Sequence, residues 1–188
     1  EREGIYRRVK EVERTLPLMA HSLMISQFRV CLSLAVKAHG AKITRFTQGY
    51  DLKEMLRDVH GENPSLVPDA FFTLEDKDDV INFFLEADRG TMKTERVVDK
   101  LKIYWSWRSD ERLKKKLRLA RFRVLTIAPS ERRSDSLRNA GKGGDPRGDG
   151  SLMFLFTSET RYNTATPKAI LQVIWKSPKD DSPHSILE

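Results

Sequence analysis

The segment from residue 66 to residue 90 contains two apolar runs with a short, highly charged stretch at their junction. The runs are LVPDAFFTLE and VINFFLEADRG, and the junction is EDKDD. This pattern favours two antiparallel strands joined by a turn. The second run is apolar almost without interruption from Val80 to Leu85, which is typical of a central strand buried on both faces. The chain is therefore predicted to build a sheet that helices cover on both sides.

Further helices and strands are expected on either side of this hairpin. A helix is predicted in HSLMISQFRVCLSLAVKAHG, with Ser22 or Ser26 capping its start and Gly40 following its end. The remaining predictions are strands in AKITRFTQ, RFRVLTIAPS and SLMFLFTSETR, helices in TERVVDKLKIYWSWR and ERRSDSLRNAGK, a polar connection with a short helical piece in DLKEMLRDVHGENPS, a flexible loop in GKGGDPRGDG and a short apolar segment in PKAILQVIW. This order predicts an α/β fold with a mixed central sheet of about five strands flanked by helices.

Composition limits the class of protein. The chain has 188 residues, of which 39% are hydrophobic, enough for a single core. Its one cysteine, Cys31, lies among apolar residues, which excludes a disulfide framework and favours a cytoplasmic location. No apolar run approaches about 18 residues and no signal peptide opens the chain, so we expect it neither to span a membrane nor to be secreted.

Three carboxylates fall at the ends of the two hairpin strands. Residues two apart on a strand share a face, so Glu86 and Asp88 should point toward the side where the preceding strand presents Asp69. Close carboxylates repel one another, and a divalent cation would offset that repulsion while binding a substrate phosphate. Asp69, Glu86 and Asp88 are thus candidate ligands for Mg²⁺ or Mn²⁺ and candidate catalytic residues for phosphodiester cleavage.

The alternative interpretation needs no metal. In it the carboxylates are solvated at the strand ends or paired with nearby cations, namely Arg89, Lys93 or Arg96. Spacing alone does not decide between the two interpretations.

The same residues resemble a known family. Pro68-Asp69 followed by Glu86-Ala87-Asp88 is similar to the PD-(D/E)xK nuclease core, and the longer pattern resembles the replication-relaxation family of plasmid and mobile-element proteins. The features that carry the resemblance are HSL at 21–23, PDAFF, FFLEADRGT, a following helix with Lys100 and Tyr104, the late strand and PKAILQVIW.

The resemblance implies a division of the chain. It places a restriction-endonuclease-like PD-(D/E)xK domain at 21–176 and a polar C-terminal tail at 177–188. Residues 1–20 would be a linker or helix leading out of an N-terminal winged-helix DNA-binding domain, which fits a chain that opens on Glu1 within a charged, helix-like segment.

The nuclease pattern requires a lysine where this chain has Asp88. That lysine holds the attacking water and stabilises charge on the phosphate, which an aspartate cannot do. Lys93 and Lys100 are the candidates to replace it, although Lys100 equally suits a solvated helix face. The resemblance also places a histidine at His21, either as a phosphate contact or metal neighbour beside Asp69, or as a helix cap or partner of a buried carbonyl.

The positive charge is concentrated in one segment. Residues 108–123 hold eight Lys or Arg against two acidic residues, whereas the net charge of the whole chain is +7. This segment is either a solvated helix face or a surface that follows a nucleic-acid backbone. The candidate nucleic-acid-binding residues are Lys114, Lys115, Lys116, Arg118, Arg121 and Arg123. Trp105 and Trp107 precede them as base-stacking candidates, with core packing favoured for Trp105, and Arg132, Arg133 and Arg138 could extend the surface.

Three functions are compatible with these residues. The first is a DNA-associated accessory of plasmid or mobile-element replication or transfer, whose nuclease-like domain binds DNA or a partner. The second is a Mg²⁺- or Mn²⁺-dependent endonuclease or nickase. The third is a dimerisation or docking platform for an upstream DNA-binding domain. The expected partners are DNA, a second copy of the chain, or replication and transfer proteins, and no membrane.

Overall fold

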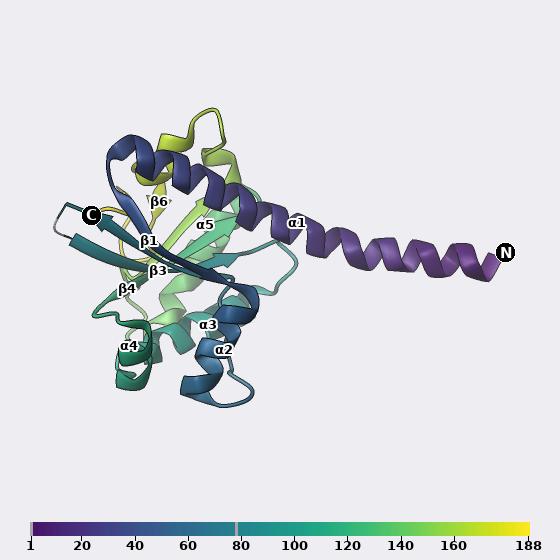
Figure 1. The fold of residues 1–188 in the computed structure, drawn as a ribbon, viewed down its shortest axis with the longest axis horizontal. Coiled ribbons are helices and arrows are strands. Elements are labelled where there is room, and N and C mark those ends of the chain that lie inside the picture. The colour runs from purple at the N-terminus through teal and green to yellow at the C-terminus, as the bar shows by residue number, and fades with distance from the viewer. Residues whose placement is uncertain (1, 78) are drawn as a thin grey trace.

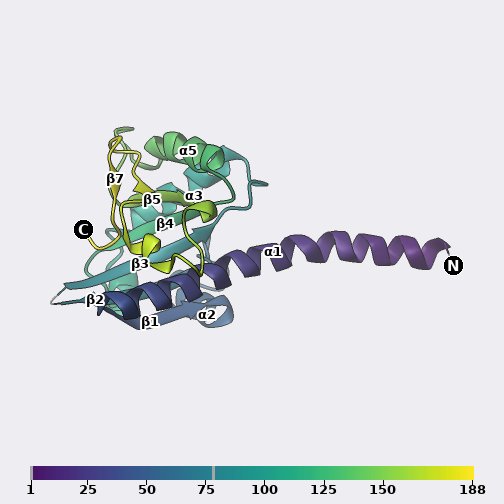
Figure 2. The ribbon, with the colours of Figure 1, turned by 90° about the horizontal axis from the view of Figure 1, so that it is seen from above.

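The protein is a three-layer arrangement with one sheet between helices (Figures 1 and 2). The computed structural model describes residues 2–77 and 79–188. The helices are α1 (Arg2–His39), α2 (Gly49–His60), α3 (Thr94–Trp107), α4 (Glu111–Leu117) and α5 (Glu131–Ala140), with 3-10 turns at Gly141–Gly144, Glu159–Arg161 and Pro167–Leu171. The strands are β1 (Lys42–Gln48), β2 (Ala70–Asp76), β3 (Asp79–Ala87), β4 (Phe122–Ala128), β5 (Phe154–Ser158), β6 (Trp175–Lys176) and β7 (Pro183–His184). The predicted α/β class is confirmed.

The sheet is mixed, and its strands lie side by side in chain order from β1 to β7. The hairpin prediction is confirmed, because β2 and β3 pair antiparallel with Ala70 opposite Leu85. Strands β3, β4 and β5 are parallel, so β3 is central and buried as its apolar run predicted. The predicted number of about five strands is smaller than the seven observed, because β6 and β7 are two-residue strands that carry no sequence signal.

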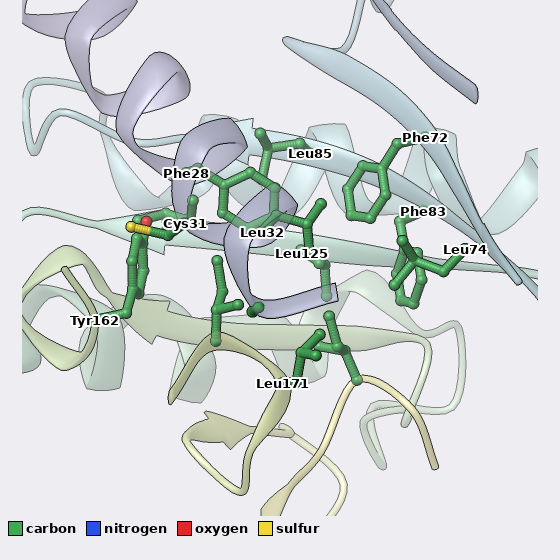
Figure 3. Close-up of a cluster of buried hydrophobic side chains, with 14 of the residues drawn as sticks. Phe28, Cys31, Leu32, Phe72, Leu74, Phe83, Leu85, Leu125, Tyr162 and Leu171 are labelled. Carbon is green, nitrogen blue, oxygen red and sulfur yellow. The ribbon is translucent and has the colours of Figure 1, made fainter. Parts of the chain in front are cut away.

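One face of the sheet packs against α1 (Figure 3). Phe28, Cys31 and Leu32 of α1 are fully buried there, so the cysteine that lies among apolar residues in the sequence is a core residue. Phe28 lies 5.7 Å from the ring of Phe72 on β2, and Phe72 stacks on Phe83 of β3 at 4.9 Å. Helix α1 is therefore attached to the sheet through aromatic contacts to the central hairpin.

The other face packs against α2, α3, α4 and α5. The helix predicted in TERVVDKLKIYWSWR is confirmed as α3, and its apolar side chains Val97, Leu101 and Tyr104 are all buried. Trp107 is also buried, and Trp105 is partly buried against the same cluster. Both tryptophans thus contribute to the core, in agreement with the packing interpretation of Trp105.

Helix α1 is much longer than predicted, and the expected caps Ser22 and Ser26 lie inside it. Its N-terminal part extends away from the rest of the molecule in both views (Figures 1 and 2). The backbone stays helical through Pro17, although proline cannot donate the hydrogen bond of that turn. By length and composition alone, Leu18–His39 would be apolar enough to cross a membrane, and a third of that window is buried within the protein. The expectation that the chain does not span a membrane stays a prediction.

Three other segments differ from the sequence-based expectations. Residues 49–60 form the complete helix α2 rather than a short helical piece. The segment at 177–188, expected as a polar tail, contributes β7 and buries Ile186. The loop expected to be flexible at 141–150 packs closely against α3, because a Cβ on Gly144 would lie 2.6 Å from Cβ of Leu101.

Candidate functional site

The candidate site lies at the carboxyl end of β3, where three helices meet the sheet. The pairing of Ala70 with Leu85 places Asp69 beside Glu86, as the sequence predicted. Asp69 precedes β2 and donates its backbone N–H to the Leu85 carbonyl at 3.0 Å. Glu86 and Asp88 bind side chains of α3 and α5, which pack on the same face of the sheet, so they do share a face. The hairpin therefore brings all three predicted carboxylates to one end of the sheet.

Asp69 connects β3 to α1. Its Oδ2 accepts the backbone N–H of Ala87 at 2.7 Å, and its Oδ1 lies 3.0 Å from Nε2 of His21. The hydrogen bond and charge of Asp69 raise the pKa of His21 above its ordinary value, although partial burial acts in the opposite direction. His21 is thus a partner of Asp69, as the resemblance implied, and it lies within α1 rather than ahead of the helix.

Glu86 connects β3 to α3. Its Oε2 accepts from Nζ of Lys100 at 2.5 Å, and its Oε1 accepts from the Tyr104 hydroxyl at 2.6 Å. Burial raises the pKa of Glu86, whereas Lys100 and Tyr104 stabilise its charged form. Burial alone would lower the pKa of Lys100, but the charge of Glu86 raises it. Burial and the neighbouring Glu86 also raise the pKa of Tyr104, which keeps the hydroxyl protonated as a donor.

Asp88 connects β3 to α5. Arg133 approaches its two carboxylate oxygens with Nε at 2.7 Å and Nη2 at 3.1 Å, a bidentate geometry. The same Nη2 donates to the Met92 carbonyl at 2.6 Å, and Asp88 also accepts the backbone N–H of Gly90 at 3.0 Å. Arg133 therefore serves this site, and the prediction that it extends a nucleic-acid surface is not the role that its contacts support.

The three carboxylates do not fit a shared divalent cation in this arrangement. Among the residues whose side chains the structure describes (16, 18–77 and 79–188), no group of three or more His, Cys, Asp or Glu side chains lies close enough together to hold a metal ion. Asp69, Glu86 and Asp88 instead face His21, Lys100 and Arg133 respectively. A metal would have to displace these partners, so we derive no chemical step through one.

The structure distinguishes between the two candidate replacement lysines. Lys100 reaches Glu86 from the second turn of α3. Lys93 is exposed at the N-cap of the same helix. Of the two, only Lys100 occupies a position beside the carboxylates. From sequence spacing alone, Lys100 could equally have been a solvated residue on the outer face of the helix.

A second candidate site is a basic cavity of about 620 Å³ at the opposite end of β3 and β4. Its lining includes Asn82 of β3 and Phe122 of β4, which pair where the parallel ladder begins. Four basic side chains contribute to it, Arg108, Lys114, Arg121 and Arg123. Two acidic residues, Asp79 and Glu188, share the lining. We call this the basic cavity.

The predicted basic residues divide into two groups around this cavity. Lys114, Arg121 and Arg123 line it, whereas Lys115, Lys116 and Arg118 are exposed on or just after α4. Some are already paired: Lys114 contacts Glu111 at 2.8 Å, and Lys116 contacts Asp58 at 2.5 Å. The sequence therefore located the basic surface but not the hollow within it.

The roles of Arg133 and Arg108 in these sites could not be predicted from the sequence. Arg133 lies 45 residues from Asp88, and nothing in its local spacing indicates the contact. Arg108 was counted in the charge of the segment without a role, yet it lines the basic cavity and lies 4.2 Å over the ring of Trp105. The local signal for this contact was the position of Arg108 three residues after Trp105, at helical spacing.

The family model described as replication-relaxation matches residues 2–129. The chain belongs to the replication-relaxation family. Family membership points to a role in the replication or transfer of plasmids or mobile elements. No curated protein and no solved structure matches the chain.

The family match covers most of the residues that build the two sites. His21, Asp69, Glu86 and Lys100 fall within it, as does the basic segment at 108–123. Arg133 and strands β5 to β7 lie beyond it. The restriction-endonuclease-like assignment of the core stays a prediction.

We predict that Lys100→Met destabilises the protein by about 2–4 kcal/mol at pH 8, because it leaves the buried Glu86 charge without its cation. Without Lys100, the folded-state pKa of Glu86 rises further above its unfolded value. Protonation of Glu86 then favours the folded state, so the loss should shrink as the pH falls to 5. Urea unfolding at both pH values measures this.

The matched control is Glu86→Gln in the Lys100→Met background, which should restore part of the stability and remove the added pH dependence. An equal loss at pH 5 and pH 8, unchanged by Glu86→Gln, would show that Lys100 acts through packing alone.

We predict that an NMR titration of the histidine ring protons places the pKa of His21 above the ordinary value of about 6.5. Because the folded-state pKa is raised, the stabilisation by protonated His21 is complete below the unfolded pKa and is lost as the pH rises through the folded value. Asp69→Asn should lower the pKa of His21, whereas His39→Gln should leave it unchanged. A His21 pKa that does not respond to Asp69→Asn would contradict the pairing.

Proposed function

We propose that the protein is a DNA-associated accessory of plasmid or mobile-element replication or transfer, and that the basic cavity with the exposed face of α4 contacts the DNA backbone. The observation that carries the proposal is the convergence of Arg108, Lys114, Arg121 and Arg123 on one hollow. Lysine and arginine side chains that neutralise phosphates release counterions, which supplies affinity without sequence preference.

The fold supports this proposal by concentrating charge on one side. The exposed residues Lys115, Lys116 and Arg118 adjoin the cavity-lining residue Lys114 on the short helix α4 and its C-cap. Arg118 occupies the left-handed C-cap position with φ of 56°. This end of α4 therefore presents several positive charges to solvent beside a concave surface. Such an arrangement suits a phosphate backbone that crosses the opening of the cavity.

The carboxylate site supports binding over cleavage. Its three acidic side chains are each satisfied by a donor from a different helix, so the site stabilises the fold as it stands. The candidate DNA contacts lie at the other end of the parallel strands, next to Asn82 and Phe122. In this proposal the start of β3 contributes to DNA binding, and its carboxyl end stabilises the fold.

We predict that the double variant Lys115→Glu and Arg121→Glu weakens DNA binding and lowers the slope of log affinity against log salt by about 2, one for each lost phosphate contact. Both residues are exposed, so their replacement should not unfold the protein. Fluorescence anisotropy with a labelled duplex at several salt concentrations measures the affinity and the slope.

The matched control is Lys37→Glu, an exposed charge change at the end of α1 on the opposite face of the sheet. It changes the net charge without touching the cavity. Because it matches one of the two substitutions in charge, it is compared with Arg121→Glu alone. Equal effects of these two single variants would indicate only a net-charge effect, and absence of salt-sensitive binding by the wild type would refute the proposal.

One observation favours phosphodiester cleavage as a second candidate function. Lys100 lies beside Glu86 and supplies the positive charge that Asp88 cannot. A nicking assay on supercoiled plasmid in Mg²⁺ or Mn²⁺ tests this candidate. Under the binding proposal we expect no nicking above background. Nicking that is abolished by both Glu86→Gln and Lys100→Met, in variants shown to be folded, would establish cleavage instead.

A further inference from the structure

Helix α1 carries a second apolar stripe that the protein does not bury. Leu16, Met19, Leu23, Val30 and Leu34 are all exposed, with Leu16 at 58% and Leu23 at 65%. A helix turns by about 100° per residue, so these five positions fall on one side of α1. The stripe is regular rather than scattered, which sets it apart from ordinary exposed apolar residues.

This stripe lies nearly opposite the face that packs on the sheet. The buried positions Met24, Phe28 and Ala35 point into the core. By helical geometry, Leu23 and Val30 lie about 100–160° around the helix axis from them. The core therefore accounts for only one apolar side of α1, and the second side gives Leu18–His39 its membrane-like composition.

Four of the five stripe positions have the spacing of a coiled coil, and Leu34 lies one residue beyond the next position of that spacing. Positions 16, 19, 23 and 30 follow the alternation of three and four residues, with the exposed Ser26 at the intervening position. The sequence continues the same alternation toward the N-terminus with Val12, Val9 and Ile5. A heptad spacing of this length is the pattern of a helix that packs along another helix.

We propose that a second copy of this chain covers the stripe, forming a parallel two-stranded coiled coil along α1. The helix has 38 residues, about 57 Å, and its N-terminal part extends away from the sheet, so that no other element of the described residues lies beside it (Figure 2). This inference goes beyond the proposed function and does not depend on DNA binding.

Two observations favour an identical partner. In the sequence, Arg8 and Glu13 flank the stripe five residues apart, the spacing at which opposite charges pair between parallel helices in register. Five apolar side chains, each about half exposed, remove on the order of 900 Å² from water over two copies, near the roughly 1,000 Å² of a specific interface.

Sedimentation equilibrium of the full chain tests the association. The wild type should form a dimer, and Leu23→Glu should raise the dimer dissociation constant by about a hundredfold, because a charge enters the apolar seam. Leu18→Glu is the matched control, since Leu18 is 68% exposed on the same helix but lies off the stripe. It should leave the dimer intact.

A second variant guards against misfolding. Met19 is 55% exposed on the stripe, and Met19→Glu should reproduce the effect of Leu23→Glu while circular dichroism shows an unchanged fold. A wild type that stays monomeric at all concentrations overturns the proposal. So does a dimer that Leu18→Glu weakens as much as Leu23→Glu.

Cysteine crosslinking tests the orientation. In a parallel dimer the two copies of residue 19 face each other, so Met19→Cys should form an interchain disulfide under mild oxidation and Leu18→Cys should not. Cys31 is fully buried and does not compete. The reverse crosslinking pattern overturns the parallel arrangement, and a monomer that floats with phosphatidylcholine and phosphatidylglycerol vesicles assigns the stripe to a membrane instead.

Discussion

The buried carboxylate of Glu86 is the constraint on which the arrangement of the central helices depends. A charge at the end of a buried central strand is costly unless donors surround it, and here α3 supplies both Lys100 and Tyr104. The flanking carboxylates are matched in the same way by α1 and α5, through His21 and Arg133. One strand end thus fixes the positions of three helices that lie on both faces of the sheet. Apolar packing alone would hold those helices without specifying their register.

The parts of the fold that repeat a local pattern were predictable. The β2–β3 hairpin followed from two apolar runs around a charged turn, and the α3 stripe followed from helical spacing. The start of α1 was not predictable, because Ser22 and Ser26 are good caps whose signal was overridden by a helix that continues to Arg2. β6 and β7 were not predictable, because a strand of two residues shows no periodicity in the sequence.

The candidate site was predictable only on the strand side. Strand alternation placed Glu86 and Asp88 on one face and brought Asp69 beside them. Their partners come from helices whose docking is set by the tertiary fold, so Arg133 had no local signal and Lys100 could not be separated from Lys93. The basic cavity was hidden for the same reason, since it brings together the end of α3, helix α4 and the start of β4.

The two edge strands of the sheet, β1 and β7, determine which surfaces remain for association with another chain. At one edge, the pairing of β1 has a register shift between Ile43 and Arg45, and the strand carries charged side chains. At the other edge, β7 has only two residues. Neither edge strand offers a long, flat row of unpaired backbone groups, so a neighbouring chain has little opportunity to add a strand. Copies of the chain at high local concentration would therefore be protected from open-ended pairing of their sheets into fibres. Contacts between copies would form through helices, where side chains rather than backbone groups determine which partner binds.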